Sequence, residues 1–313
     1  MSRPQRPSKR GAAPPDGPPV TEPRAEPGAE PAATPGDGSG RGGPAPPTLA
    51  ERFAHRVQIK LPSRHNPRLA KIVELVNEDD RIYALWVAAN VTAVDRLQMS
   101  DHGPVHMHII ANSALRLLRL LMSADVQPNI VSDYGLEPGD AEVVVALAAL
   151  LHDVGMSIHR EGHEGFSLFV AQPILEEILA EVYEPPVDTI VRSEVLHAII
   201  SHRSGGTPLT VEGGVLLIAD ALDMAQGRSR IPFTAGSTSI HAVSAAAIES
   251  VHIEACDSHP VRIRIEMSNS AGVFQIDELL RRKLKGSGLE QYVVVEAVIE
   301  GETEKRLVQR FRF

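Results

Sequence analysis

Histidine and aspartate side chains gather in one part of the sequence. Eight of the 13 histidines lie between His102 and His202, and His152 is followed directly by Asp153. Histidine is the commonest metal ligand in proteins and the usual acid or base near neutral pH. Burying an imidazole beside a carboxylate costs free energy unless the two are paired or bind a metal. The pair therefore indicates a metal site, although a histidine at a helix end beside a capping aspartate is the alternative.

Further candidate ligands stand before and after this pair. His102 and His106 are four residues apart, so on a helix they would share one face. Asp220 lies within an apolar helical stretch, and an aspartate in such surroundings is rarely buried without a partner. Asp223, one helical step further on, could orient a ligand or join a capping network. His108 would point elsewhere and is expected to be structural.

The elements that must position these residues are helices. Apolar residues recur at helical spacing from about residue 49 to 227, and Asp140 and Thr210 are expected as N-caps, with Gly155 as a C-cap. The predicted helices are Asp79–Leu97, Asp101–Met122, Asp140–Gly155, His163–Ala171, Pro173–Tyr183, Val187–His202 and Thr210–Gln226.

The rest of the chain has a different character. Residues 1–47 contain 13 Pro and 8 Gly and no aromatic residue, which predicts a disordered tail. After residue 228 the pattern alternates as in strands. Helices are expected at His241–Glu249 and Phe274–Lys285, and strands at Val251–Ala255, Val261–Met267, Tyr292–Ile299 and Lys305–Phe313. The predicted fold is mainly α: a helical domain at 48–228, then a small α+β domain at 229–313 with an antiparallel sheet.

Composition excludes several classes of protein. The single cysteine, Cys256, allows neither an intrachain disulfide nor a cysteine-based zinc site. A formal net charge of −9 makes nucleic acid an unlikely partner, because neutralising phosphates requires a basic field. The longest apolar run, Val143–Leu151, is too short to cross a bilayer, and no signal-peptide stretch is seen. We expect a cytoplasmic protein that has no contact with membranes.

The order of the candidate ligands resembles a known family. His106, then His152 with Asp153, then Asp220 is similar to the H…HD…D signature of the HD superfamily of metal-dependent phosphohydrolases. The surrounding residues resemble the family's motifs at 106–111 (HMHIIA), 150–155 (LLHDVG) and 217–222 (LIADAL). The resemblance covers roughly residues 67–227. It implies a bundle of five or more helices around the metal, which agrees with the helical pattern.

The resemblance also suggests how many ions the site holds. Two-metal members add histidines between the HD pair and the last aspartate, and His163 and His202 stand in similar positions here. Asp153 would then bridge two divalent ions, and Mn, Fe, Co, Ni, Zn or Mg would suit these ligands. The alternative is one ion, with His163 and His202 facing substrate or solvent. His102 or His159 could protonate the leaving oxygen.

The chain departs from the family's pattern where phosphate would be bound. Met156 stands where relatives often have a lysine that meets a phosphate. The cation must then come from elsewhere, because arginine pairs well with phosphate oxygens. The candidates are Arg160, Arg203, Arg228 and Arg230, with solvated surface arginines as the alternative.

These observations lead to a predicted function. The enzyme would hydrolyse a phosphomonoester or phosphodiester of a nucleotide or related small phosphate, using a metal-activated water. The alternative is a non-catalytic HD module that binds a nucleotide and regulates. The C-terminal domain could gate substrate or join copies into a homo-oligomer. The basic run Arg281–Lys285 is expected to be either a solvated surface or a weak site for an anionic ligand.

Overall fold

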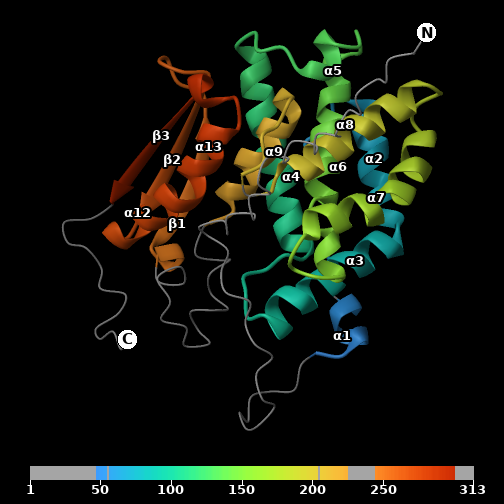
Figure 1. Cartoon of the computed structure of the whole chain (residues 1–313), viewed down its shortest axis with the longest axis horizontal. Helices are drawn as coiled ribbons and strands as arrows, with labels where there is room; N and C mark the ends of the chain where they lie inside the picture. The colour runs from blue at the N-terminus through green and yellow to red at the C-terminus, as the bar shows by residue number, and fades with distance from the viewer. Residues whose placement is uncertain (1–46, 55, 204, 225–243, 300–313) are drawn as a thin grey trace, which may run out of the picture. The chain divides into compact units, whose positions relative to one another are not determined.

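The computed structural model describes residues 47–54, 56–203, 205–224 and 244–299. Within these ranges the chain is mainly helical, with a small sheet near its C-terminal end, which confirms the predicted fold class (Figure 1). The predicted disordered tail, apart from residue 47, lies outside the described residues, as does the strand expected at 305–313. None of the helices in the described ranges combines the length and apolar character that a membrane crossing requires.

The described part of the chain before residue 225 contains nine α-helices and two other helical segments. The α-helices are α1 (Leu49–Ala54), α2 (Pro67–Glu78), α3 (Asp80–Asn90), α4 (Pro104–Ser123), α5 (Asn129–Ser132), α6 (Pro138–Leu151), α7 (His163–Ala180), α8 (Val187–Ser201) and α9 (Val211–Leu222). Helix α3 continues as a π-helix over Val91–Arg96, and a 3-10 turn at Val154–Ser157 follows α6.

Helix α6 is the centre of the bundle. Every side chain from Asp140 to Leu151 is buried, and α2, α4, α8 and α9 pack around the helix (Figure 1). A helix that is apolar on all sides is stable only when other elements cover every face. The C-terminal end of α6, which carries the His-Asp pair, is thereby held inside the core.

The start and end of α6 differ from the prediction. The N-cap is Glu137, and Asp140 is the third helical residue, whose carboxylate accepts a hydrogen bond from the Glu137 backbone N–H at 2.9 Å. Pro138 explains the earlier start, because proline suits the first helical position and lacks an N–H that would need a partner. The helix ends at Leu151, so Gly155 is not its C-cap. Thr210 is the N-cap of α9, as predicted.

Two other helix predictions need correction. The segments expected at 163–171 and 173–183 form one helix, α7, with Pro173 inside it. A proline removes one backbone hydrogen bond, but Ala171 and Leu175 on either side stay buried, and this packing keeps the helix continuous. Helix α4 begins at Pro104 rather than at residue 101, so His102 precedes the helix instead of sharing its face with His106.

The sheet is mixed, not antiparallel as predicted. Its strands, β1 (Ile248–Glu254), β2 (Val261–Met267) and β3 (Val293–Ile299), lie in the order β1-β2-β3. β1 runs antiparallel to β2, whereas β3 runs parallel to it, with Val261 opposite Val293. The helical connection between β2 and β3 explains the difference, because a crossover of that length returns the chain to the same end of the sheet.

The segment from 268 to 292 forms that connection. It contains α12 (Val273–Gln275), a π-helical stretch at Ile276–Arg281 and α13 (Arg282–Gly286), between 3-10 turns at Ser270–Gly272 and Glu290–Tyr292. Strands β1 and β2 contact α4, and α13 contacts α9. Ile248 and Glu249, expected at the end of a helix, begin β1 because Ile248 pairs with Met267. The earlier part of that helix prediction, 241–243, lies outside the described residues.

Candidate metal centre

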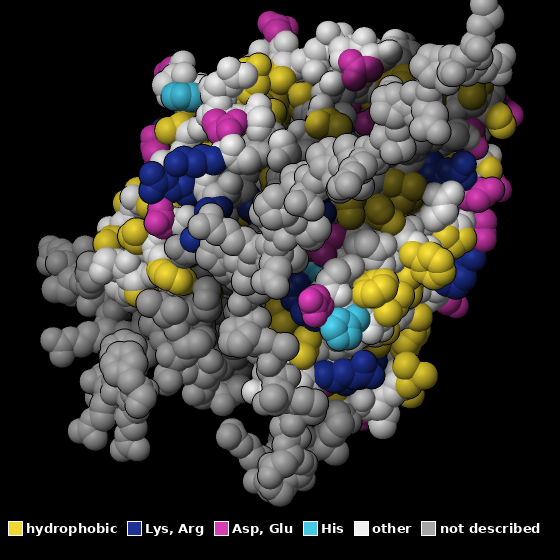
Figure 2. Space-filling model, viewed as in Figure 1, with side chains coloured by type: hydrophobic (Ala, Val, Ile, Leu, Met, Phe, Trp, Pro, Cys, Tyr) yellow, Lys and Arg dark blue, Asp and Glu magenta, His cyan; other side chains and the backbone are white. Residues whose placement is uncertain are grey.

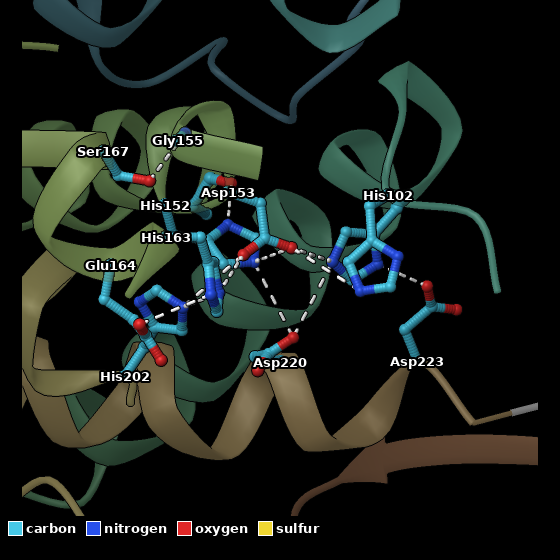
Figure 3. Close-up of polar contacts among 12 residues, drawn as sticks. His102, His152, Asp153, Gly155, His163, Glu164, Ser167, His202, Asp220 and Asp223 are labelled. Atoms are coloured by element: carbon cyan, nitrogen blue, oxygen red, sulfur yellow. Dashed lines mark hydrogen bonds and ion pairs between the residues drawn. The ribbon is translucent and has the colours of Figure 1, made fainter. Parts of the chain in front are cut away.

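Five helices bring six histidine and aspartate side chains to one place (Figure 3). They come from the first turn of α4 (His106), the end of α6 (His152 and Asp153), the start of α7 (His163), the end of α8 (His202) and the last turns of α9 (Asp220). All but Asp220 are buried residues, and the Asp220 side chain is only 15% exposed.

One group of ligand atoms forms around one oxygen of Asp153. The Oδ2 atom of Asp153 lies 3.6 Å from His106 Nε2 and 3.4 Å from His152 Nε2, and the three residues could hold a metal ion together. Asp220 Oδ1 lies 3.7 Å from each of the same two nitrogens. We call these four residues the first group. Their donor atoms converge on one point.

A second group forms around the other oxygen of Asp153. Oδ1 lies 3.1 Å from His163 Nε2 and 3.5 Å from His202 Nε2, and the two nitrogens are 3.4 Å apart. Asp153, His163 and His202 could also hold a metal ion. Asp153 thus belongs to both groups, with one oxygen directed to each.

The four imidazoles are oriented in the same way. Each has Nδ1 within hydrogen-bond distance of a protein oxygen, and its Nε2 faces the carboxylates. The oxygens belong to the Asp223 carboxylate for His106 (2.6 Å), and to the main-chain carbonyls of Ala149 for His152 (2.9 Å), Arg160 for His163 (3.0 Å) and Ile199 for His202 (2.5 Å). Metal-binding histidines usually have such a second partner, which fixes the tautomer and leaves the Nε2 lone pair for the ion.

The surroundings of His152 Nε2 show whether these residues fit a metal ion. It is buried, and it makes no hydrogen bond within the described ranges. Leaving a buried polar atom without a partner costs about 1–3 kcal/mol. A divalent ion between His152 and the carboxylates would take up its lone pair, and imidazole with carboxylate is a ligand set that transition-metal ions accept. The residues therefore fit a divalent metal.

The pKa values of both carboxylates in the cluster are lowered. Burial alone would raise the pKa of Asp153, but the adjacent His152 and the contacts with the imidazoles of His106, His163 and His202 hold that pKa well below its usual value. Burial also raises the pKa of Asp220, and the charge of Lys283 together with the contact to His152 outweighs it, so this pKa is lowered as well. Two negative charges are thus available to a cation.

Gly155 holds the 3-10 turn against the start of α7. Its backbone N–H donates to Ser167 Oγ at 2.9 Å (Figure 3). A Cβ atom at this position would lie 2.1 Å from the carbonyl oxygen of His163 and 2.4 Å from the nitrogen of Ser167. Only glycine permits this approach, which places His163 next to Asp153.

The comparisons with known proteins agree with this arrangement. The family model of the HD domain matches residues 128–225, a range that holds His152, Asp153, His163, His202 and Asp220. The chain is 44% identical over 214 residues to "Uncharacterized protein MJ1020" of Methanocaldococcus jannaschii, which covers 68% of this chain and 83% of that protein. The chain belongs to the HD domain family. HD domains are generally those of metal-dependent hydrolases and bind divalent metals. No solved structure matches the chain.

We call the six candidate ligands together the HD site. His102 lies at the edge of this site, and His159 lies outside it. His102 Nε2 lies 4.0 Å from Asp153 Oδ2, and its Nδ1 lies 2.8 Å from the carbonyl oxygen of Ser100. His159 is exposed in the turn before α7, where its Nδ1 accepts from the backbone N–H of Glu161 at 3.0 Å. Among the two predicted proton donors, only His102 is next to the carboxylate shared by both groups.

The predicted phosphate-binding arginines have different positions relative to the HD site. Arg160 is exposed, and its Nη1 lies 3.0 Å from Nδ1 of His163. Arg203 is exposed and directly follows His202. Arg228 and Arg230 lie outside the described residues. Arg160 is thus the one of the two described arginines with a contact to a candidate ligand.

Sequence analysis missed Lys283 as a residue of the HD site. This lysine lies on α13, and its Nζ forms a salt bridge with Asp220 Oδ2. The available signal is the basic run Arg281–Lys285, which by sequence alone indicates a solvated surface or a weak site for an anion. Spacing along the chain cannot place this run, because 63 residues separate Lys283 from Asp220.

Proposed function

We propose that this protein is a metal-dependent phosphohydrolase that cleaves a phosphomonoester or phosphodiester of a nucleotide or related small phosphate. One observation carries the proposal. Asp153 directs one oxygen to each of two groups of buried imidazoles, whose Nδ1 atoms all lie next to protein oxygens. A carboxylate shared in this way suits a pair of divalent ions, the arrangement with which many enzymes hydrolyse phosphate esters.

The candidate ligands form two sets, one for each ion. His106, His152 and Asp220 would hold one ion and His163 and His202 the other, with Asp153 common to both. When bound, such ions polarise a phosphoryl oxygen and lower the pKa of a coordinated water, so that it can attack near neutral pH. The hydrogen bonds at each Nδ1 keep the ring nitrogens aimed inward, so little reorganisation is needed when an ion binds.

His102 is the residue placed to deliver a proton to the leaving oxygen. Its Nδ1 lies 2.8 Å from the carbonyl oxygen of Ser100, and donation to this carbonyl turns Nε2 toward Asp153. In the imidazolium form, Nε2 carries a proton on the side of the cluster. A histidine titrates near neutral pH, so it can hold this proton and give it up during the reaction.

The charge distribution supports a small substrate rather than a nucleic acid. The net charge is −9, and Figure 2 shows basic side chains in small groups beside acidic ones on the described part of the face in view. A long polyanion binds best to a continuous basic surface.

A cytoplasmic location belongs to the same proposal, supported by the lack of a membrane-crossing helix in the described ranges. Association of copies through the C-terminal domain stays a prediction.

A non-catalytic nucleotide-binding module is the second candidate, and Met156 is the observation that favours it. The Met156 side chain is fully buried and packs with Ala89 and Ala93, so this position supplies no cation to a phosphate. A site without a phosphate-binding cation could bind metal and nucleotide without turnover. The complete set of six candidate ligands favours catalysis, because a regulatory site does not need all of them.

The deciding experiment combines metal analysis with a substrate panel. Purified protein is loaded with Mn²⁺, Fe²⁺, Co²⁺, Ni²⁺, Zn²⁺ or Mg²⁺ and tested on nucleoside mono-, di- and triphosphates, cyclic nucleotides and simple phosphate esters. Asp153→Ala, purified in the same way, controls for contaminating phosphatases. Turnover in the wild type and none in the variant supports the proposal. Tight nucleotide binding with metal bound and no turnover would instead establish the regulatory module.

A further inference from the structure

The C-terminal segment contributes one charged side chain to the HD site. Lys283, on α13, forms a salt bridge with Asp220, a candidate metal ligand on α9. We propose that Lys283 binds the phosphate group of the substrate and supplies the cation that Met156 does not. The inference rests on the proposed function, because it assigns a residue to the substrate of that same site.

Asp220 uses its two oxygens for different neighbours. Oδ1 lies 3.7 Å from Nε2 of His106 and of His152, whereas Oδ2 bonds Lys283 Nζ. Lysine is therefore not in the place of a metal ion: both can share the carboxylate, one at each oxygen. An ammonium group has three N–H donors. The bond to Asp220 uses one, which leaves two that can reach an oxygen of a phosphate beside the ions.

The position of Lys283 is fixed by close packing of α13 on α9. A Cβ atom at Gly214 of α9 would lie 2.4 Å from the carbonyl oxygen of Ser287, so the two segments nearly touch. Leu280 and Leu289, before and after α13, are buried. Ser287 Oγ donates to the carbonyl of Leu284 at 2.6 Å and accepts from the N–H of Leu289 at 3.0 Å. Packed residues before and after α13 thus fix the position of the helix that carries Lys283.

The charges around the cluster show why a cation is needed there. The carboxylates of Asp153 and Asp220 both lie in the cluster, and that of Asp223 lies behind His106. Without bound cations, these carboxylates would repel a phosphate. Arg160 stands at the His163 end of the cluster, and Lys283 stands at the Asp220 end. The side chain of Lys283 is 20% exposed, so it is open to solvent and to a ligand, unlike the buried Met156.

A simpler role would be that Lys283 only neutralises and positions Asp220. The two roles differ in what is lost when the charge is removed. A positioning lysine affects metal occupancy, because it sets the geometry of a ligand. A phosphate-binding lysine affects the affinity for phosphate and the KM for substrate, while the metal content stays the same.

The test uses full-length protein loaded with Mn²⁺ and inorganic phosphate as the probe. Lys283→Met removes the charge and keeps the length of the side chain, and Lys283→Arg restores a cation. Lys285→Met is the matched control, because Lys285 is an exposed lysine on the same helix. Calorimetry measures the phosphate Kd, elemental analysis measures the manganese content, and circular dichroism checks the fold.

We expect Lys283→Met to weaken phosphate binding by about 10- to 100-fold, the range for a lost hydrogen bond between charged groups. Manganese content should not change, Lys283→Arg should recover most of the affinity, and Lys285→Met should bind like the wild type. Equal phosphate affinity in the two methionine variants, or a loss of manganese in Lys283→Met, would overturn the assignment.

A measurement on the wild type removes any dependence on the folding of the variants. Phosphate should slow the acetylation of Lys283 relative to that of Lys285, as followed by mass spectrometry on Mn²⁺-loaded protein. Equal rates for Lys283 with and without saturating phosphate would contradict the proposal. The proposed function is judged separately. If phosphate binding depends on Lys283 but no ester is turned over, the proposed hydrolase activity is refuted and the phosphate-binding role of Lys283 is supported.

Discussion

The imidazoles of the two groups of candidate ligands differ in how completely they are buried and in what lies beside them. In the first group, His106 and His152 have no exposed side-chain surface, and their Nδ1 atoms face the buried Asp223 carboxylate and a carbonyl inside the core. In the second group, His163 is the first residue of α7, and its Nδ1 is next to Arg160, which is exposed. His202 lies at the end of α8, directly before a loop.

This difference indicates unequal binding of two ions. Imidazoles that are enclosed on all sides are pre-organised, so binding costs little conformational entropy. Imidazoles beside exposed residues and loops can move with those segments, since surface segments open more easily than the core. We therefore expect the first group to bind its ion more tightly, and the second group to exchange its ion more readily.

The largest effect should come from removing the residue common to both groups. Asp153→Ala should abolish binding of both ions and lower turnover by about 1,000-fold or more, because bound ions supply several kcal/mol of transition-state stabilisation. In the wild type, Mn²⁺ at a concentration 100 times its Kd should add about 2.7 kcal/mol to the free energy of unfolding and so raise the Tm. The variant should lose this rise.

Metal content and thermal melting check this prediction on the same samples. Without metal, the variant should melt at or below the wild-type Tm, because it loses the contacts with the surrounding imidazoles that favour the ionised carboxylate in the folded protein. Wild-type turnover in Asp153→Ala would rule out both the shared carboxylate and the two-ion arrangement.

Single substitutions in each group separate the two ions. His163→Gln should keep the tighter ion and most of the Mn²⁺-induced rise in Tm, because the first group stays complete. His106→Gln should lose the tighter ion and most of that rise. A chelator titration followed by elemental analysis measures both variants against the wild type. If both variants lost all metal, the groups would be one site rather than two.

Substituting residues that contact the Nδ1 atoms of the ligands should change metal affinity less than substituting the ligands themselves. The effect should again differ between the two groups. Asp223→Asn weakens the partner of His106 Nδ1 and should reduce affinity for the tighter ion by about 10- to 100-fold, as is usual for such supporting residues. Glu164 Oε2 lies 3.3 Å from His163 Nδ1 and is partly exposed. Glu164→Gln should therefore change the affinity of the second ion only a few-fold, as surface ion pairs contribute little. Competition with a fluorescent chelator measures both.

The smallest effects concern the turn that carries the second group. Gly155→Ala should lower the free energy of unfolding by about 1–3 kcal/mol, because the new Cβ must displace the start of α7. It should also weaken the second ion more than the first.

Gly165→Ala is the matched control in α7. Apart from the two neighbouring residues and the nearby backbone of α7 itself, no heavy atom of the described residues lies within 4 Å of a Cβ atom at Gly165. Alanine should therefore be neutral there or stabilise the helix by up to about 1 kcal/mol. Urea unfolding of the metal-free proteins compares the two. Equal stability in both variants would show that the close approach at Gly155 is not needed.

The sequence was most informative where local patterns act within one element. Apolar spacing predicts the helices, and Thr210 predicts the start of α9, because capping depends only on neighbouring residues. Predictions that weighed one local signal against another were less accurate. The sequence favours Asp140 as the N-cap, whereas Pro138 sets the start of α6. The sequence also predicts a helix break at Pro173, whereas packing on both sides keeps α7 continuous.

The sheet shows a second limit. The pattern at Val293–Ile299 predicts a strand but does not give its direction, which follows from how the helical segment before it crosses the sheet. The same segment brings Lys283 to Asp220. Both results depend on where a connection packs, and packing involves residues far apart in the chain.

The sequence by itself determined which residues could be metal ligands, because the family's motif names them in order and their types restrict the chemistry. Only the tertiary structure decided that Asp153 directs one oxygen to each group, that His102 lies beside the cluster while His159 does not, and that a lysine from α13 bonds Asp220. The physical reason is that side-chain direction and distance arise from helices packed against each other. The sequence identifies the side chains that can donate to a metal, but it does not determine where in space their donor atoms meet.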